Sequence, residues 1–198
     1  MNEIFHFISN LDFNWSIIES IAVIFSITYV ILATKQNLWC WAFAAISVLL
    51  YIYICFSAQL FAETGLQCFY LIMAGYGFYS WKKPKKTLST KQLKASSHLL
   101  IILVGGILAF LLGFYFSTYT SAKIPIVDSF TTIFSIIATY MITQKILENW
   151  LYWIIIDAVS IYLYFSRELH LTSMLFLLYT LIAIFGYFSW VRKIDVDA

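Results

Sequence analysis

Charged residues, glycine and proline are scarce in this sequence. Only 11% of its 198 residues are charged, and it has 7 Gly and 2 Pro, whereas 62% of the residues are hydrophobic. Soluble domains carry about 25% charged and about 45–50% apolar residues, so the composition excludes a soluble enzyme, a nucleic-acid-binding domain and a disordered chain. The three cysteines, Cys40, Cys55 and Cys68, lie inside apolar runs without paired spacing, which indicates neither a disulfide framework nor a metal site.

Motifs for catalysis and cofactor binding are also absent from the sequence. It has no glycine-rich phosphate loop, no G-x-S-x-G nucleophile motif and no pair of acids suited to acid–base chemistry. His6, His98 and His170 are too widely spaced to form a metal-ligand pair. We therefore expect no enzyme activity, no bound metal and no cofactor.

The sequence instead contains seven apolar runs of roughly 20 residues, the length that crosses the hydrocarbon core of a bilayer. Backbone groups in lipid must satisfy their own hydrogen bonds, and uninterrupted runs such as 101–116 lack the alternation of a β-barrel strand. The sequence predicts an all-α integral membrane protein with seven transmembrane helices, at 15–34, 38–56, 60–81, 98–119, 125–144, 147–166 and 169–190.

Positive charge is concentrated in the connection between the third and fourth runs. Loops rich in lysine stay on the cytoplasmic side, which predicts an N-terminus outside and a C-terminus inside a bacterial cytoplasmic (inner) membrane. Ten of the twelve basic residues agree with this direction, and Lys123 and Arg167 are the exceptions. A lipid-binding or regulatory role is the alternative for the six clustered lysines, which are Lys82, Lys83, Lys85, Lys86, Lys91 and Lys94.

The chain also contains an internal repeat. Residues 19–81 align without a gap on residues 128–190 at an offset of 109, and the matches include tryptophans, glycines and serines in one register. Each repeat holds three spans, so the predicted units are a first repeat at 15–81, a basic loop with a linker helix at 82–124, and a second repeat at 125–190. This 3+1+3 parallel duplication resembles the layout of SWEET sugar transporters, in which the substrate site lies between the repeats.

The sixth span carries an acid close to its centre. An ionised Asp157 there would cost about 2.5–3.5 kcal/mol on insertion scales. Steps of three and four residues place it on one helix face with tryptophans that could stack on a flat cationic ring. The alternative is a structural hydrogen bond between helices. The face predicted to bind substrate comprises Trp150, Trp153, Asp157, Ser160 and Tyr164.

A second polar face lies on the third span, where Glu63, Gln67 and Tyr70 follow helical spacing. Gln67 is deep and offers both a donor and an acceptor, so we expect it to bind substrate, with interhelical hydrogen bonding as the alternative. Glu63 is near the outer end of the span, where a charge is inexpensive. Trp81 and Trp190 end their spans, and this position predicts that they anchor the protein at the membrane interface.

Two motifs resemble the Pnu family of vitamin transporters. One is the run from Asn149 through Trp150 and Trp153 to Asp157, and the other is Gln67 followed by the Gly-Phe-Tyr-Ser-Trp run at 77–81. The resemblance covers about residues 21–193 and includes the 3+1+3 layout. Some family members have asparagines where this chain has Ser47, Ala74, Asp157 and Phe185.

The resemblance implies facilitated diffusion of a vitamin, which a cytoplasmic kinase then traps by phosphorylation. The family also includes transporters of thiamine, riboflavin and deoxynucleosides. Nicotinamide riboside and thiamine both carry a cationic ring that suits Asp157. Nicotinamide riboside is the expected substrate because it is the commonest assignment in the family that the sequence resembles, and thiamine is the alternative. A non-transporting membrane scaffold is the alternative from another class. The expected partners are the small cationic vitamin, the lipid bilayer and the kinase, with no nucleic acid; a homo-oligomer is compatible with the sequence.

Overall fold

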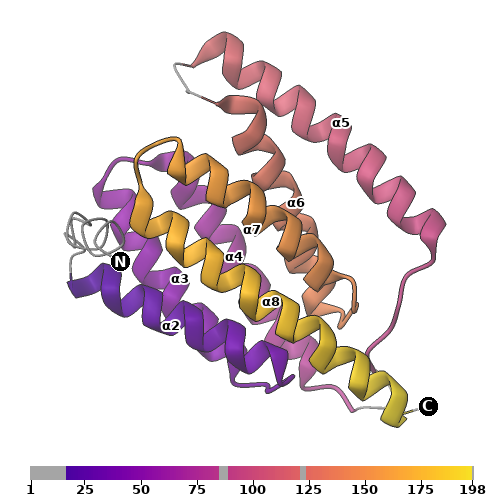
Figure 1. Cartoon of the computed structure of the whole chain (residues 1–198). Helices are drawn as coiled ribbons and strands as arrows, with labels where there is room; N and C mark the ends of the chain where they lie inside the picture. The colour runs from indigo at the N-terminus through magenta and orange to yellow at the C-terminus, as the bar shows by residue number, and fades with distance from the viewer. Residues whose placement is uncertain (1–16, 85–88, 121–123, 198) are drawn as a thin grey trace, which may run out of the picture.

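The computed structural model describes residues 17–84, 89–120 and 124–197, and these residues form seven α-helices (Figure 1). The expected all-α fold is therefore observed, and each predicted span corresponds to one helix. The helices are α2 (Ile17–Thr34), α3 (Cys40–Ser57), α4 (Phe61–Trp81), α5 (Ala95–Tyr119), α6 (Pro125–Thr143), α7 (Asn149–Phe165) and α8 (His170–Asp197).

Length and apolar composition identify this chain as a multi-pass membrane protein. Within the described residues, α2, α3, α5, α6 and α8 are each long and apolar enough to cross a membrane. Helix α7 is apolar but has 17 residues, which is the short end of the range for a span. Helix α4 has 21 residues and carries the polar face predicted from the sequence. The outward-facing side chains of these helices are mostly large and apolar, as a lipid-facing surface requires.

The helices pack as two groups of three with one helix outside them (Figure 1). In the first group α3 contacts both α2 and α4, and in the second α7 contacts both α6 and α8. The groups meet where α2 contacts α8 and where α4 contacts α6. Helix α5 packs against α6, at the edge of the bundle. This arrangement leaves an interior between the two groups.

Four helices end in the same hydrogen-bonded turn, with a non-glycine residue in the left-handed conformation. After α2, Gln36 has φ 56° and donates to Ala33 O at 2.9 Å, and the next N–H, of Asn37, donates to Leu32 O at 3.0 Å. Such a turn satisfies carbonyls that a helix end leaves free. The left-handed residues of the four turns are Gln36, Gln59, Lys145 and Glu168.

These turns lie at equivalent places in the two groups, because Gln36 and Lys145, like Gln59 and Glu168, are 109 residues apart. Helix α2 and helix α6 end at positions 109 apart, and the starts of α3 and α7 and of α4 and α8 have the same offset. The backbone correspondence supports the proposed duplication into 15–81 and 125–190, which stays a prediction.

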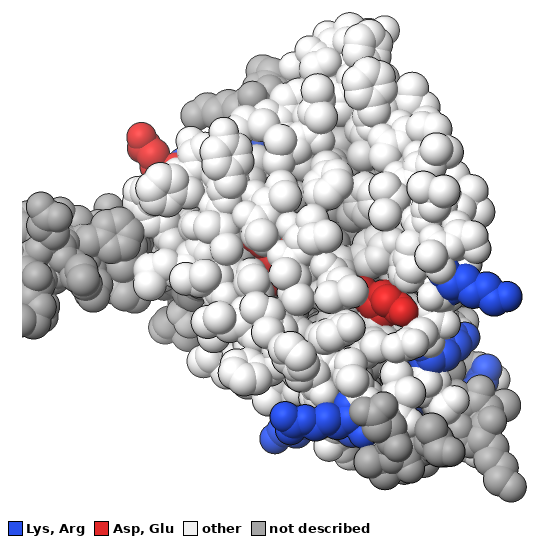
Figure 2. Space-filling view, turned by 45° about the vertical axis from the view of Figure 1, so that its right-hand side comes forward, with Lys and Arg blue, Asp and Glu red and all other residues white. Residues whose placement is uncertain are grey.

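Lysine and arginine side chains collect at one end of the bundle, while the face shown in Figure 2 is otherwise almost uncharged. We call the end that carries Lys82, Lys83, Lys91, Lys94 and Lys145 the basic end. Glu63, Asp128 and Arg167 lie at the opposite end, where an Arg167 Nη2 to Asp128 Oδ2 ion pair of 2.5 Å ties the loop after α7 to the start of α6. The predictions for the N-terminus, Lys85, Lys86 and Lys123 fall outside the described residues.

Candidate functional site

A cavity of about 220 Å³ lies between the two helix groups, near the middle of the bundle. It is slightly smaller than typical sites for drug-sized ligands, which measure about 300–1,000 Å³. Helices of both groups contribute to it, so a ligand here would contact both. Its polar and aromatic lining consists of Ser26, Tyr29, Trp41, Ser47, Tyr51, Gln67, Tyr70, Thr139, Trp150, Trp153, Asp157, Phe176 and Tyr179.

Asp157 is the acid of this cavity. Asp157 is only 3% exposed. Its carboxylate makes no hydrogen bond or ion pair with any residue in the described parts of the chain. The structural hydrogen bond considered as an alternative is therefore not present in this conformation. A buried carboxylate without a partner is unfavourable by several kcal/mol, so the site favours a cation or a hydrogen-bond donor supplied by a ligand.

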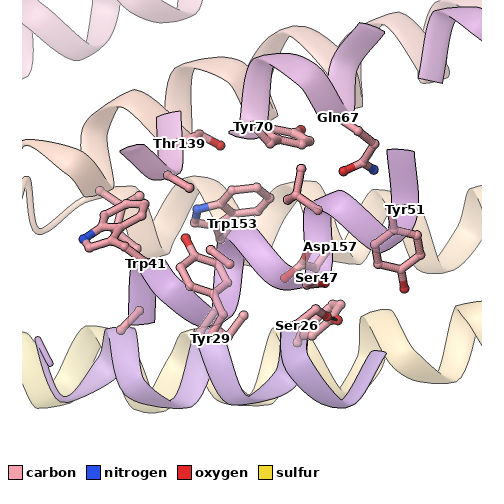
Figure 3. A pocket seen from close by; sticks show the side chains of 18 of the residues that line it. Ser26, Tyr29, Trp41, Ser47, Tyr51, Gln67, Tyr70, Thr139, Trp153 and Asp157 are labelled. Atoms are coloured by element: carbon pink, nitrogen blue, oxygen red, sulfur yellow. Dashed lines mark hydrogen bonds between the residues drawn. The ribbon is translucent and has the colours of Figure 1, made fainter. Parts of the chain in front are cut away.

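Aromatic and polar side chains surround Asp157 on both sides (Figure 3). Trp153 lies one helical turn before it on α7 and presents its indole to the same space. Gln67 and Tyr51 come from α4 and α3 and lie toward the other end of the cavity. Together these groups provide a ring to stack on, a negative charge, and neutral donors and acceptors, which suits a flat cationic head with a hydroxylated tail.

The structure brings five of the eight predicted site residues into the cavity lining: Gln67, Tyr70, Trp150, Trp153 and Asp157. The other three lie outside this lining. Ser160 is buried one turn beyond Asp157, and Tyr164 stacks on Phe176 with ring centroids 5.0 Å apart. Glu63 is exposed at the start of α4. The cavity thus borders only the middle turns of the predicted faces, and their role in substrate binding stays a prediction.

Sequence reasoning missed the contributions of α2 and α3 to the cavity. The repeat could have found two missed residues, because Trp41 corresponds to Trp150 and Tyr179 corresponds to Tyr70 at the offset of 109. No such signal distinguishes Tyr29 or Tyr51, which have no tyrosine at the corresponding place. Of the positions where some family members have asparagine, Ser47, Ala74 and Asp157 line the cavity, whereas Phe185 is largely exposed on α8.

Four tryptophans close the cavity toward the basic end. Trp41 packs edge-on against Trp81 at 5.3 Å between ring centroids, and Trp150 packs in the same way against Trp190 at 5.5 Å. Trp81 and Trp190 contact each other at 6.0 Å, so the four rings form one continuous layer. This layer separates the cavity from the lysines.

The prediction that Trp81 and Trp190 anchor the protein at the membrane interface is wrong. Trp190 is 0% exposed and Trp81 is 7% exposed. The Trp81 Nε1–H donates to Ile142 O at 3.2 Å, and the Trp190 Nε1–H donates to Ala33 O at 3.1 Å. Each bond joins one helix group to the other, so these indoles hold the groups together instead of facing lipid headgroups.

A further contact between the groups lies beside the cavity, where Ser26 of α2 hydrogen-bonds the Tyr179 hydroxyl of α8. The cavity lining contains no lysine or arginine, as far as the chain is described. The described residues also hold no cluster of His, Cys, Asp or Glu that could bind a metal ion. The electrostatic character of the cavity is therefore set by Asp157.

Comparisons with known proteins agree on the kind of molecule. The family model described as nicotinamide mononucleotide transporter matches residues 16–192. The nicotinamide riboside transporter PnuC of Escherichia coli (strain K12) is 26% identical, over 92% of this chain and 87% of the relative. The riboflavin/roseoflavin transporter RibM of Streptomyces davaonensis is 21% identical, over 89% of this chain and 84% of the relative. A crystal structure of the vitamin B3 transporter PnuC superimposes with a TM-score of 0.73 at 21% identity, and covers 100% of this chain and 88% of that one.

Proposed function

The chain belongs to the nicotinamide mononucleotide transporter family, and we propose that it carries nicotinamide riboside across the membrane as a transporter, leaving the substrate chemically unchanged. The observation that carries this proposal is the buried, unpartnered carboxylate of Asp157 in an aromatic cavity. The pyridinium ring of nicotinamide riboside is permanently positive and flat. It would neutralise Asp157 and stack on Trp153, while its ribose hydroxyls would reach neutral groups such as Gln67.

The chemistry of the cavity favours the riboside over two other substrates named for the family and its relatives. Nicotinamide mononucleotide adds a phosphate, which would meet Asp157 and no compensating lysine or arginine within the described lining. Riboflavin is uncharged and larger, so it neither needs the carboxylate nor suits a cavity of about 220 Å³. Thiamine is the second candidate, because its thiazolium ring satisfies the same electrostatic requirement.

We take the basic end to be cytoplasmic, since lysine-rich loops remain on that side of the membrane. The N-terminus would then lie outside and the C-terminus inside. The described helices contain no series of buried acids for proton relay, which favours facilitated diffusion. A cytoplasmic kinase that phosphorylates the vitamin would make uptake directional, because the charged product cannot return through this cavity.

The tryptophan layer would then be the cytoplasmic closure of the transporter. Release of substrate into the cell requires an opening between the helix groups at the basic end. The hydrogen bonds from Trp81 to Ile142 and from Trp190 to Ala33 join the two helix groups at this end. The four rings and these two bonds would therefore have to separate during each transport cycle.

The decisive test is the variant Asp157→Asn, which keeps the shape of the side chain and removes its charge. Two charges about 4 Å apart interact by about 4 kcal/mol at an effective dielectric constant of 20, and part of this is offset by desolvation. We therefore expect nicotinamide riboside to bind at least about tenfold more weakly. The neutral dihydropyridine form of the riboside should bind both proteins nearly equally. Isothermal titration and uptake would be measured for each ligand.

The matched control is Glu63→Gln, which removes a charge at the exposed start of α4 and should leave both ligands unaffected. Equal weakening of the charged and neutral ligands by Asp157→Asn would show that the carboxylate is structural. A second variant, Trp153→Ala, should also weaken binding about tenfold, as for loss of a cation–π contact of about 1–2 kcal/mol. Trp39→Ala is its control because Trp39 is 65% exposed.

A further inference from the structure

Helix α5 is supported on one side only, and this leaves a groove beside it. It packs against α6, and it makes no contact with α4 in the described part of the chain. Helices α4 and α5 thus form two walls with α6 between them, and the space they enclose measures about 740 Å³. Leu100 and Tyr140 on its rim are 62% and 52% exposed, so the groove opens outward to the surrounding lipid.

The groove is apolar along its length and polar at its basic end. Its walls are formed by Phe69 and Met73 of α4, Leu100 and Ile101 of α5, and Ile136 and Ile137 of α6. Polar groups join the lining only at the basic end, and they are Lys91, Ser97, Tyr140 and Gln144. A long apolar slot that ends in a cation at the edge of the hydrocarbon layer is complementary in shape and in charge to a phospholipid with an anionic head group.

Lys91 is held in place by its backbone. The Lys91 N–H donates to Lys145 O at 3.1 Å, and the Leu147 N–H donates to Lys91 O at 2.9 Å, which forms an isolated β-bridge to the loop between α6 and α7. Gln36 Nε2 donates to Thr90 Oγ1 at 2.8 Å and fixes the preceding residue. The ammonium group therefore extends from a fixed main chain, and it makes no ion pair with a described residue.

The nearby acid does not neutralise this charge. Both oxygens of Glu148 accept the Leu93 N–H at 3.3 Å, and Glu148 Oε1 lies 3.9 Å from His98 Nε2. The His98 ring in turn hydrogen-bonds the Tyr152 hydroxyl at 3.1 Å. Glu148 is thus engaged by the Leu93 backbone and His98. It is not among the described residues that line the groove, whose charged member is Lys91.

We infer that this groove binds one anionic phospholipid from the leaflet at the basic end. Its phosphate contacts Lys91 Nζ and the Ser97 hydroxyl, and one acyl chain lies between α4 and α5 along Met73 and Ile101. The lipid lies between α4 and α5, which do not contact each other directly, and so connects α5 to the first helix group. The site is separate from the central cavity, so it is independent of which substrate the protein carries.

The test compares phosphatidylglycerol with phosphatidylcholine of identical acyl chains, added to the full-length protein in detergent. Native mass spectrometry counts bound lipid, and thermal unfolding confirms that each variant is folded. Lys91→Gln should weaken phosphatidylglycerol binding about fivefold, which is about 1 kcal/mol for one lysine at a membrane surface. Lys94→Gln changes the same charge three residues away, outside the groove, and should alter binding less than twofold.

The apolar half of the site is tested by Ile101→Trp, which fills the groove without changing its charge. It should reduce binding of both lipids, whereas Leu103→Trp on the exposed side of α5 should not. Equal affinity of the wild-type protein for the two lipids would overturn the proposal. So would an equal effect of Lys91→Gln and Lys94→Gln, which would indicate only a diffuse surface charge. Dissociation of an oligomer by Ile101→Trp would show that a second copy of the chain occupies the groove.

Discussion

Replacing Gly77 by alanine tests whether close packing behind the cavity sets its shape. A Cβ at Gly77 would lie 2.4 Å from the Trp41 ring, and a Cβ at the corresponding Gly186 would lie 2.7 Å from the Trp150 ring. Carbon atoms in contact are normally about 3.5–4.0 Å apart. Each ring would therefore have to move by about an ångström, and both rings line the cavity. The glycines let α4 and α8 approach the tryptophans closely enough to hold them.

The two energetic effects of Gly77→Ala have opposite signs. Alanine is favoured over glycine inside a helix by about 0.5–1 kcal/mol. Overpacking a tight interior costs about 1–3 kcal/mol, which outweighs that gain. Gly75→Ala, two residues away on the same helix, is the matched control, because a Cβ there meets no described atom within 4 Å. Gly75→Ala should stabilise the protein, whereas Gly77→Ala should destabilise it.

Thermal unfolding in detergent measures the stability difference, and isothermal titration with nicotinamide riboside measures the effect on the cavity. Gly77→Ala should lower both the unfolding temperature and the affinity, and Gly186→Ala should do the same. Gly75→Ala should raise the unfolding temperature and leave the affinity unchanged. If Gly77→Ala binds as tightly and unfolds as late as Gly75→Ala, then the tryptophan positions are not fixed by helix packing and the reasoning is wrong.

Three further outcomes follow from the structure. Trp190→Phe keeps a ring but removes the donor to Ala33 O, so it should lower stability by about 0.5–1.5 kcal/mol; stability equal to wild type would mean that this bond contributes nothing. Ser89→Cys should react with a membrane-impermeant thiol reagent only from the cytoplasmic side, and labelling in intact cells would reverse the proposed orientation. Gln59→Gly should relieve a left-handed residue at φ 59° and raise the unfolding temperature, whereas Ala58→Gly, at φ −82°, should lower it.

The sequence predicted the helices well because a membrane span needs a long apolar run, and such a run is visible without knowledge of tertiary contacts. It also predicted the sides of α4 and α7 that border the cavity, because polar residues repeat there at helical spacing; that these sides bind substrate stays a prediction. The predicted faces also include Ser160 and Tyr164, which lie outside the cavity lining, since a helical face continues beyond the few turns that border a cavity. Periodicity defines a direction around a helix but not the depth at which a cavity begins and ends.

The error at Trp81 and Trp190 has a different physical origin. A tryptophan at a helix end has the same local sequence whether it faces lipid headgroups or another helix. Its partner carbonyls, at Ile142 and Ala33, belong to helices more than 60 residues away in the chain. Only the packing of the two groups brings these atoms together. The same limit applies to Tyr29 and Tyr51, which are ordinary aromatic residues of apolar helices until the fold places them around Asp157.

Under the proposed duplication, the two helix groups border the cavity with corresponding helices. Some corresponding positions in the lining carry the same residue type, and others carry different ones. Trp41 and Trp150 correspond to one another, whereas Asp157 corresponds to Val48 and Trp153 corresponds to Ala44. A fully symmetric cavity would accept an elongated ligand in two opposite directions. Within this lining, the Asp157 carboxylate and the Trp153 indole occur only on α7, so under the proposed function a cationic ring would bind on that side alone. We therefore expect one bound orientation, with the ring at α7 and the uncharged remainder of the substrate toward the neutral side chains of α3 and α4.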